Sequence, residues 1–222
     1  MIHIFDVDYT VIRHSSAWYF LREALARKIV SFSQIRGIPF EWLRYKIGCA
    51  NQEFIEESVK YIVGIEKGVL EQIAGDCFDR CLKANIYSGA VSLIREIRSR
   101  GETVFFATSS FHTLIKPLEH FLGISESLAS TLEFKDGKTT GRLVGESFFG
   151  VRKKAAVMAW LEKRALRPEE LCFYSDSYTD LPLLEYCGKP VAINPDRFLE
   201  REAKNRGWQI FRFKQTLGQI RA

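Results

Sequence analysis

Short apolar segments alternate with amphipathic helical segments along most of the chain. Apolar, β-rich runs typical of buried strands lie at residues 2–7, 103–107, 171–174, 191–194 and 208–211. Apolar residues recur at helical spacing at residues 90–100, 111–122, 154–164, 179–186 and 198–206. Strands that alternate with helices predict an α/β fold whose core is a doubly wound, Rossmann-like parallel sheet.

Residues 13–85 follow a different pattern, because no convincing strand interrupts the helical spacing. Ser15 or Ser16 can cap a first helix, and further helices are expected at residues 52–63 and 67–83. The expected domains are a small all-α insert at residues 13–85 and a Rossmann-like core at residues 1–12 and 86–222.

A β-hairpin is expected in the second half of the chain. Residues 128–134 and 139–144 have strand patterns, and Asp136, Gly137 and Lys138 form a turn sequence between them. We therefore expect the two segments to pair with each other.

Composition indicates an ordinary globular protein. The 222 residues are 46% hydrophobic and 27% charged, and the net charge of +5 only weakly favours anionic partners. No long block of Lys and Arg predicts nucleic-acid binding, and no apolar run is long enough for a transmembrane segment. The first residues lack a signal-peptide pattern, and the five cysteines form neither a zinc pattern nor a disulfide framework. We therefore expect a cytoplasmic protein with free thiols, and a homodimer is left open.

Polar residues follow three of the predicted strands at their carboxyl ends, where ligands bind in parallel sheets. A lysine at the start of a predicted helix can add a positive charge. The candidate residues are Asp6, Asp8, Thr108, Ser109, Ser110, Asp176, Asp180 and Lys154. For the lysine, the neighbouring Lys153 is the alternative. Lys154 is preferred because an apolar helical pattern continues from it. Ser109 and Ser110 could donate to phosphate or cap the following helix.

Carboxylates crowded at one edge repel one another unless a cation neutralises them. Oxygen ligands without nearby His or Cys favour Mg²⁺ over zinc, and Mg²⁺ commonly shares its coordination sphere with a substrate phosphate. Thr108 and Lys154 suit the other phosphate oxygens. The set therefore predicts phosphoryl transfer, in which positioning and charge stabilisation supply most of the catalysis.

These residues resemble the four motifs of the haloacid dehalogenase superfamily of phosphatases. The matching segments are Asp6-Val7-Asp8-Tyr9-Thr10, Thr108 after an apolar strand, Lys154 at a helix start, and Asp176-Ser177-Tyr178-Thr179-Asp180. The resemblance covers the whole chain, since the helical insert is similar to that family's helical cap.

The resemblance implies a role for each residue. Asp6 would become phosphorylated, Asp8 would act as general acid and then base, and Thr108 and Lys154 would hold the phosphoryl oxygens. The metal residues would be Asp6, Asp8 through its carbonyl, Asp176, and Asp180 in a supporting role.

The chain most resembles the phosphoserine-phosphatase-like members, with two departures. Ser15 stands where phosphoserine phosphatases usually carry a Glu that grips the substrate's amino group, and Ser109 and Ser110 replace two glycines. Both departures argue against phosphoserine and leave a small-molecule phosphate ester as the expected partner. The insert's aromatic residues could line a pocket for the leaving group or pack its own helices; they are Trp18, Tyr19, Phe40, Trp42 and Tyr45.

Other functions remain open at this point. A phosphotransferase or a phospholipid-head-group phosphatase would use the same residues. A receiver-like signalling domain also uses a phosphorylated Asp, but it is shorter and lacks the insert. A non-catalytic binding protein would be expected to lack Asp6 or Asp8, and both are present.

Overall fold

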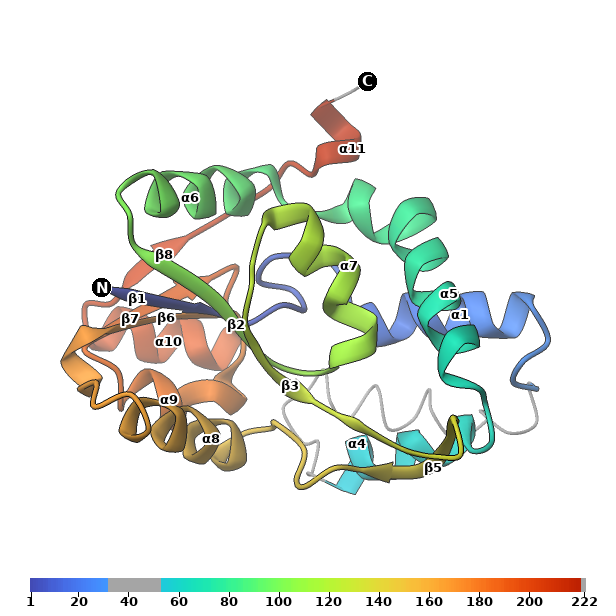
Figure 1. Cartoon of the computed structure of the whole chain (residues 1–222). Helices are drawn as coiled ribbons and strands as arrows, with labels where there is room; N and C mark the ends of the chain where they lie inside the picture. The colour runs from blue at the N-terminus through green and yellow to red at the C-terminus, as the bar shows by residue number, and fades with distance from the viewer. Residues whose placement is uncertain (32–52, 221–222) are drawn as a thin grey trace.

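The computed structural model describes residues 1–31 and 53–220, and its centre is a parallel β-sheet (Figure 1). Within the described residues, six strands pair in the order β3-β2-β1-β6-β7-β8, and every pairing is parallel. Their bounds are β1 (Ile2–Phe5), β2 (Thr103–Phe111), β3 (Ser127–Ser130), β6 (Leu171–Ser175), β7 (Lys189–Ile193) and β8 (Gln209–Phe211). This order places β1 at the point where the winding of the sheet changes direction. The predicted fold class is confirmed.

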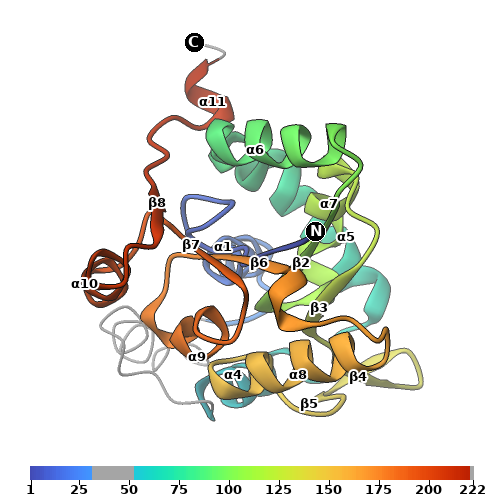
Figure 2. The ribbon, with the colours of Figure 1, turned by 90° about the vertical axis from the view of Figure 1, so that its left-hand side faces the viewer.

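Helices cover both faces of the sheet, as Figure 2 shows with α6 on one side and α8 and α9 on the other. The helices that follow β1 and the insert are α6 (Ser88–Ser99), α7 (His112–Leu122), α8 (Val151–Glu162), α9 (Leu181–Leu184), α10 (Arg197–Asn205) and α11 (Leu217–Ile220). Gly123 ends α7 in the left-handed conformation with φ of 67°, which glycine adopts without steric cost.

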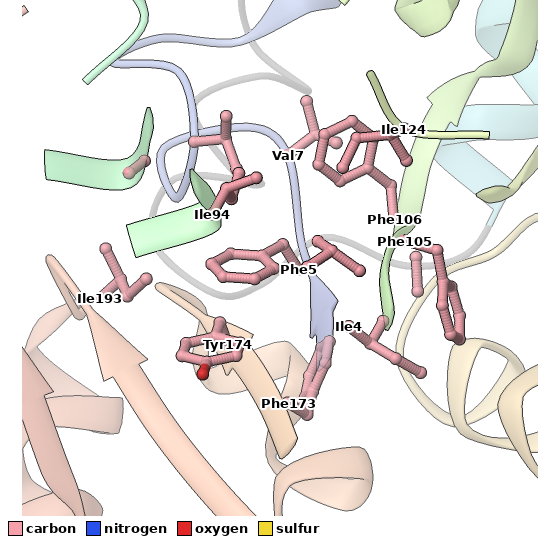
Figure 3. Packing of buried hydrophobic residues seen from close by; sticks show 14 of the residues in the cluster. Ile4, Phe5, Val7, Ile94, Phe105, Phe106, Ile124, Phe173, Tyr174 and Ile193 are labelled. Atoms are coloured by element: carbon pink, nitrogen blue, oxygen red, sulfur yellow. The ribbon is translucent and has the colours of Figure 1, made fainter. Parts of the chain in front are cut away.

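The core packs against both faces of the central strands (Figure 3). On one face the rings of Phe5 and Tyr174 stack with centroids 4.0 Å apart. On the other face Phe105 lies against Trp160 of α8, with centroids 4.3 Å apart. Full burial of one such ring contributes roughly 2 to 3 kcal/mol, so this packing holds the central strand ends in a fixed relation.

Between β1 and α6, the regular elements within the described residues are helices joined by turns, as expected for the insert. Its elements are α1 (Ser16–Ala26), α4 (Glu53–Val59), η1 (Lys60–Ile62), α5 (Lys67–Cys77), a π-helical turn η2 (Phe78–Leu82) and η3 (Lys83–Asn85). The domain boundaries at residues 12/13 and 85/86 stay a prediction.

The predicted hairpin is wrong in its first strand. Ser127–Ser130 belongs to the main sheet as β3, and the hairpin consists of β4 (Leu132–Lys135) and β5 (Lys138–Leu143). One apolar run therefore serves two sheets, which local sequence does not reveal. The hairpin also bonds to the insert, where the Gly64 N–H donates to the Thr139 carbonyl at 2.8 Å.

Within the described residues, no helix is long and apolar enough to cross a membrane. Cys77, Cys81, Cys172 and Cys187 are free thiols, and Cys49 lies outside the described residues.

Candidate active site

The central strand β1 delivers Asp6 to the edge of the sheet where ligands of doubly wound folds bind. β1 pairs with β2 on one side and β6 on the other. The Asp6 N–H continues the ladder by donating to the Tyr174 carbonyl at 2.9 Å. The backbone of Asp6 is therefore fixed by the sheet, and its side chain lies at the point where the winding reverses.

A tight turn after β1 brings Asp8 and Thr10 back toward this edge. The N–H groups of Val11 and Ile12 both donate to the carbonyl of Val7. Tyr9 takes the left-handed conformation with φ of 59°, which costs a non-glycine residue about 1 kcal/mol. The hydroxyl of Thr10 then donates to Oδ1 of Asp176 at 3.1 Å, which links the turn to the end of β6.

Lys153, not Lys154, is the lysine in this site, so the predicted position is corrected. Its ammonium group donates to Oδ1 of Asp6 at 3.0 Å and to Oδ2 of Asp180 at 2.8 Å, and the residue is 4% exposed. The Lys154 ammonium instead lies over the ring of Tyr186, 5.3 Å from its centroid.

Helical spacing explains this placement. Val157 and Trp160 are buried on the inner face of α8, and Lys153 precedes them by four and seven residues. The apolar face, extended back from these two residues, includes Lys153. Lys154 lies on a neighbouring, half-buried row of the helix.

The charges around Asp6 oppose one another. Burial raises the pKa of Asp6 to about 7, the Lys153 ammonium acts against this rise, and the nearby Asp180 and Asp8 carboxylates add to it. Burial also disfavours the charged form of Lys153, but Asp180 and Asp6 outweigh it and raise the pKa of that ammonium. Lys153 is therefore a cation held by two carboxylates.

Asp8 is buried beside the first residue of α1. The Ser16 N–H donates to Oδ1 of Asp8 at 2.9 Å, and the Ser110 hydroxyl donates to Oδ2 at 3.1 Å. Burial raises the pKa of Asp8, and the hydrogen bonds from Ser16 and Ser110 act in the opposite direction. A carboxyl group with a raised pKa is suited to donate and then accept a proton near neutral pH.

Thr108 and Ser109 lie on β2 near its carboxyl end. The Ser110 N–H donates to Oγ1 of Thr108 at 3.2 Å, and Thr108 is buried. That bond uses a lone pair of the oxygen, so the hydroxyl hydrogen can still be donated to an anion. Ser109 is half-buried beside it.

Asp176 and Asp180 follow β6. Burial raises the pKa of Asp176 well above its usual range, and the charges of Asp6 and Asp180 add to the rise. The hydroxyl of Ser175 donates to Oδ2 of Asp180 at 2.7 Å, next to the bond from Lys153. These interactions show that the carboxylates predicted from separate strands come together.

Asp196 supports this loop, a role that the sequence interpretation missed. Its N–H donates to the Asp176 carbonyl at 2.8 Å, and its Oδ2 accepts from the Tyr178 N–H at 2.7 Å. Its Oδ1 caps α10 through the N–H groups of Phe198 and Leu199. An Asp before a helical pattern signals the cap, but the contact with Asp176 depends on tertiary structure.

The donor set is suited to a hard cation that brings further ligands. Within residues 1–31 and 53–220, no three His, Cys, Asp or Glu side chains are arranged to hold a metal ion by themselves. The mutual repulsion of Asp6, Asp176 and Asp180 nevertheless favours a positive ion beside them. Mg²⁺ fits, because it usually takes one or two carboxylates and completes its shell with water and phosphate.

Two of the insert's five aromatic residues, which could line a pocket or pack its helices, lie within the described residues. Tyr19 is buried with Arg22 over its ring, while Trp18 is 45% exposed on α1. Phe40, Trp42 and Tyr45 lie outside the described residues.

Comparisons with known proteins agree with the geometry. The family model for haloacid dehalogenase-like hydrolases matches residues 4–185. The chain is 31% identical over 215 residues to phosphoserine phosphatase SerB1 of Mycobacterium tuberculosis, a match covering 95% of this chain and 70% of that protein. It is 28% identical to a histidinol-phosphatase of Neisseria meningitidis, over 95% of this chain and 98% of that protein. A solved structure of a Bordetella pertussis protein of unknown function superposes with a TM-score of 0.83 and 26% identity, over 95% of this chain and 97% of that one.

Proposed function

The chain belongs to the haloacid dehalogenase-like hydrolases and is a phosphatase, and we propose that it is a magnesium-dependent phosphomonoesterase that works through a phosphorylated Asp6. One observation carries this proposal. Oδ1 of Asp6, at the switch point of the sheet, lies 3.0 Å from the Lys153 ammonium, and the buried acid Asp8 follows two residues later. A nucleophile, a proton donor and a charge for the phosphoryl oxygens are therefore adjacent.

In the first half-reaction, a carboxylate oxygen of Asp6 attacks phosphorus. The bond from phosphorus to the ester oxygen breaks, and the leaving oxygen takes a proton from Asp8. Lys153 and the hydroxyl groups of Thr108 and Ser109 hold the phosphoryl oxygens as negative charge redistributes. The products are an alcohol, aspartyl phosphate at Asp6, and ionised Asp8.

In the second half-reaction, Asp8 accepts a proton from a water molecule as that water attacks phosphorus. The bond between phosphorus and the Asp6 oxygen then breaks, which releases inorganic phosphate and restores the Asp6 carboxylate. Asp8 is again protonated, so the cycle closes with one water consumed for each ester.

Mg²⁺ would be held by the carboxylates of Asp6 and Asp176 and by the backbone carbonyl of Asp8. When bound, it would neutralise negative charge on the carboxylates and on the substrate phosphate. Asp180 would act from the second layer, because it is bonded to Lys153 and Ser175.

The substrate is proposed to be a small phosphate ester other than phosphoserine. The SerB1 relative is named for phosphoserine, and the Neisseria relative for histidinol phosphate. Here residue 15 is a buried serine, so no carboxylate is available at that position to grip an amino group. A phospholipid head group, or transfer of phosphate to a second alcohol, would use the same residues.

Hydrolysis of p-nitrophenyl phosphate tests the mechanism. We expect activity with added Mg²⁺, loss of activity with EDTA, and loss in Asp6→Asn. The variant should fold, because the amide keeps the shape of the side chain. Full activity in a folded Asp6→Asn protein would reject the mechanism. Separately, the activity of the wild-type protein on a panel of phosphate esters that includes phosphoserine ranks the substrates.

A further inference from the structure

The carboxyl group of Asp8 lies between two serines from distant parts of the chain. Ser16 is the first residue of α1, and Ser110 lies on β2, 94 residues later. Each donates to a different oxygen of Asp8: the Ser16 N–H to Oδ1, and the Ser110 hydroxyl to Oδ2. All three residues are buried, so water does not readily replace these bonds.

The two serine hydroxyls also contact each other. Oγ of Ser16 lies 2.7 Å from Oγ of Ser110. When Asp8 is ionised, Ser110 donates to it, and Ser16 can donate to Ser110. When Oδ2 carries a proton, the Ser110 hydroxyl can rotate and accept a hydrogen bond from that O–H group, because a hydroxyl both donates and accepts hydrogen bonds. The Ser16 N–H can only donate, and the side chains of Ser16 and Ser15 also hydrogen-bond the Asp8 carboxyl group.

We propose that Ser110 is a positioning residue that holds the carboxyl group of Asp8 in the orientation that its proposed acid and base roles need. This inference rests on the proposed function. The alternative role was capping of α7, but the N-cap residue of that helix is Phe111, whose side chain makes no cap hydrogen bond. Ser110 instead joins Asp8 to the first helix of the insert through Ser16.

This role predicts a dependence on the leaving group. Phenyl and p-nitrophenyl phosphate have similar shapes, but p-nitrophenolate departs without protonation, whereas phenolate gains much from a general acid. In Ser110→Ala, the rate of phenol release in the first turnover should therefore fall at least about tenfold. This loss is part of the total rate enhancement that general acid catalysis supplies. The first-turnover burst of p-nitrophenol should change less than about threefold, and its later steady rate should fall because Asp8 also activates the water.

Rapid-mixing measurements of both esters with full-length protein and saturating Mg²⁺ test this. Ser110→Thr keeps a hydroxyl and should restore the wild-type ratio of the two burst rates. Ser130→Ala is the matched control, because Ser130 is another buried serine, on β3, and accepts a bond from the Phe148 N–H. It should leave the ratio unchanged.

Equal changes in both bursts, or no change in either, would overturn the positioning role. If Ser110→Ala does not fold, Ser110→Cys, with its weaker S–H donor, is measured against the same two criteria. Activity that persists in Asp6→Asn would instead reject the proposed function. Loss of activity in Asp6→Asn together with an unchanged burst ratio in Ser110→Ala would reject only the role of Ser110.

Discussion

The ammonium nitrogen of Lys153 lies 2.8 Å from Oδ2 of Asp180, and both side chains are almost wholly buried. The same nitrogen contacts Asp6, so one cation balances two carboxylates. Coulomb attraction in a buried site is screened much less than at the surface. The pair therefore orients Lys153 toward the proposed nucleophile.

Lys153→Met should abolish most of the phosphatase activity, whereas Lys154→Met should not. We expect kcat/KM for p-nitrophenyl phosphate to fall about 100-fold or more in the first variant, the usual effect of removing a group that stabilises developing negative charge. The second variant loses a cation–π contact with Tyr186 and should stay within about threefold of wild type. Circular dichroism checks that both fold, and similar losses in the two would contradict the assignment.

The sequence was sufficient for the fold class because both periods, of strands and of helices, are clear in it. It also identified the carboxylates, since Asp6, Asp8 and Asp176 directly follow apolar strands whose ends meet. Lys153 could have been identified from the spacing to Val157 and Trp160. The break between β3 and β4 could not, because which partner a strand pairs with depends on tertiary packing rather than on the strand itself.

The supporting contacts were beyond sequence reasoning for a related reason. Ser110 bonds an aspartate 102 residues away, and Asp196 bonds the carbonyl of Asp176 across two strand ends. Neither spacing follows a helix or strand period. Such contacts appear only when the strand order and register are known.

Asp196→Ser should weaken metal binding more than it weakens the fold. A serine can still cap α10, but its single oxygen cannot at the same time accept the bond from the Tyr178 N–H. The loop that carries Asp176 would then be less fixed. Loss of such a supporting contact typically costs about 10- to 100-fold in metal affinity. We expect a rise of about tenfold in the Mg²⁺ concentration for half-maximal activity, measured by titration.

The control for this variant is its stability. The free energy of unfolding of Asp196→Ser in EDTA should stay within about 1 kcal/mol of wild type, since the cap is kept. An unchanged Mg²⁺ requirement would show that Asp196 serves only the helix.

An ion pair links the helical insert to the core beside the site. Nη1 of Arg152, next to Lys153 on α8, lies 2.6 Å from Oε1 of Glu56 on α4. Arg152→Gln and Glu56→Gln should each raise KM about two- to threefold, because exposed pairs of this kind are worth up to about 1 kcal/mol. Arg152 also pairs with Glu146 at 3.3 Å, so the double variant should show a smaller effect than the sum of the two single effects, as expected for a direct interaction.

The pair of Arg164 and Glu126 serves as the control for that cycle. Its atoms also lie 2.6 Å apart, but Arg164 follows the end of α8, away from the insert. Neutralising this pair should leave KM unchanged. Additive effects in the Arg152 and Glu56 cycle would mean that the contact does not influence the site.

His3 should make the protein less stable in mild acid. Its ring is buried, with Nδ1 2.8 Å from the Tyr174 hydroxyl and Nε2 3.2 Å from Glu102. Burial lowers the pKa of His3 below its usual 6.5, although Glu102 acts in the opposite direction. Between its folded and unfolded pKa values His3 binds more protons in the unfolded chain, so its contribution to stability is full above about pH 6.5 and falls as the pH drops below it.

His3→Gln should therefore lose less free energy of unfolding than wild type between pH 7.5 and pH 5.5. Each tenfold difference in proton affinity between the folded and unfolded states is worth about 1.4 kcal/mol. Urea unfolding at the two pH values measures the difference, and EDTA keeps metal binding out of the comparison. His120→Gln, at an exposed histidine of α7, should keep the wild-type dependence on pH. Because only the change with pH is compared, a uniform loss of stability from the lost Tyr174 contact does not affect the test. If His3→Gln and wild type lose the same free energy of unfolding between the two pH values, His3 is not the cause.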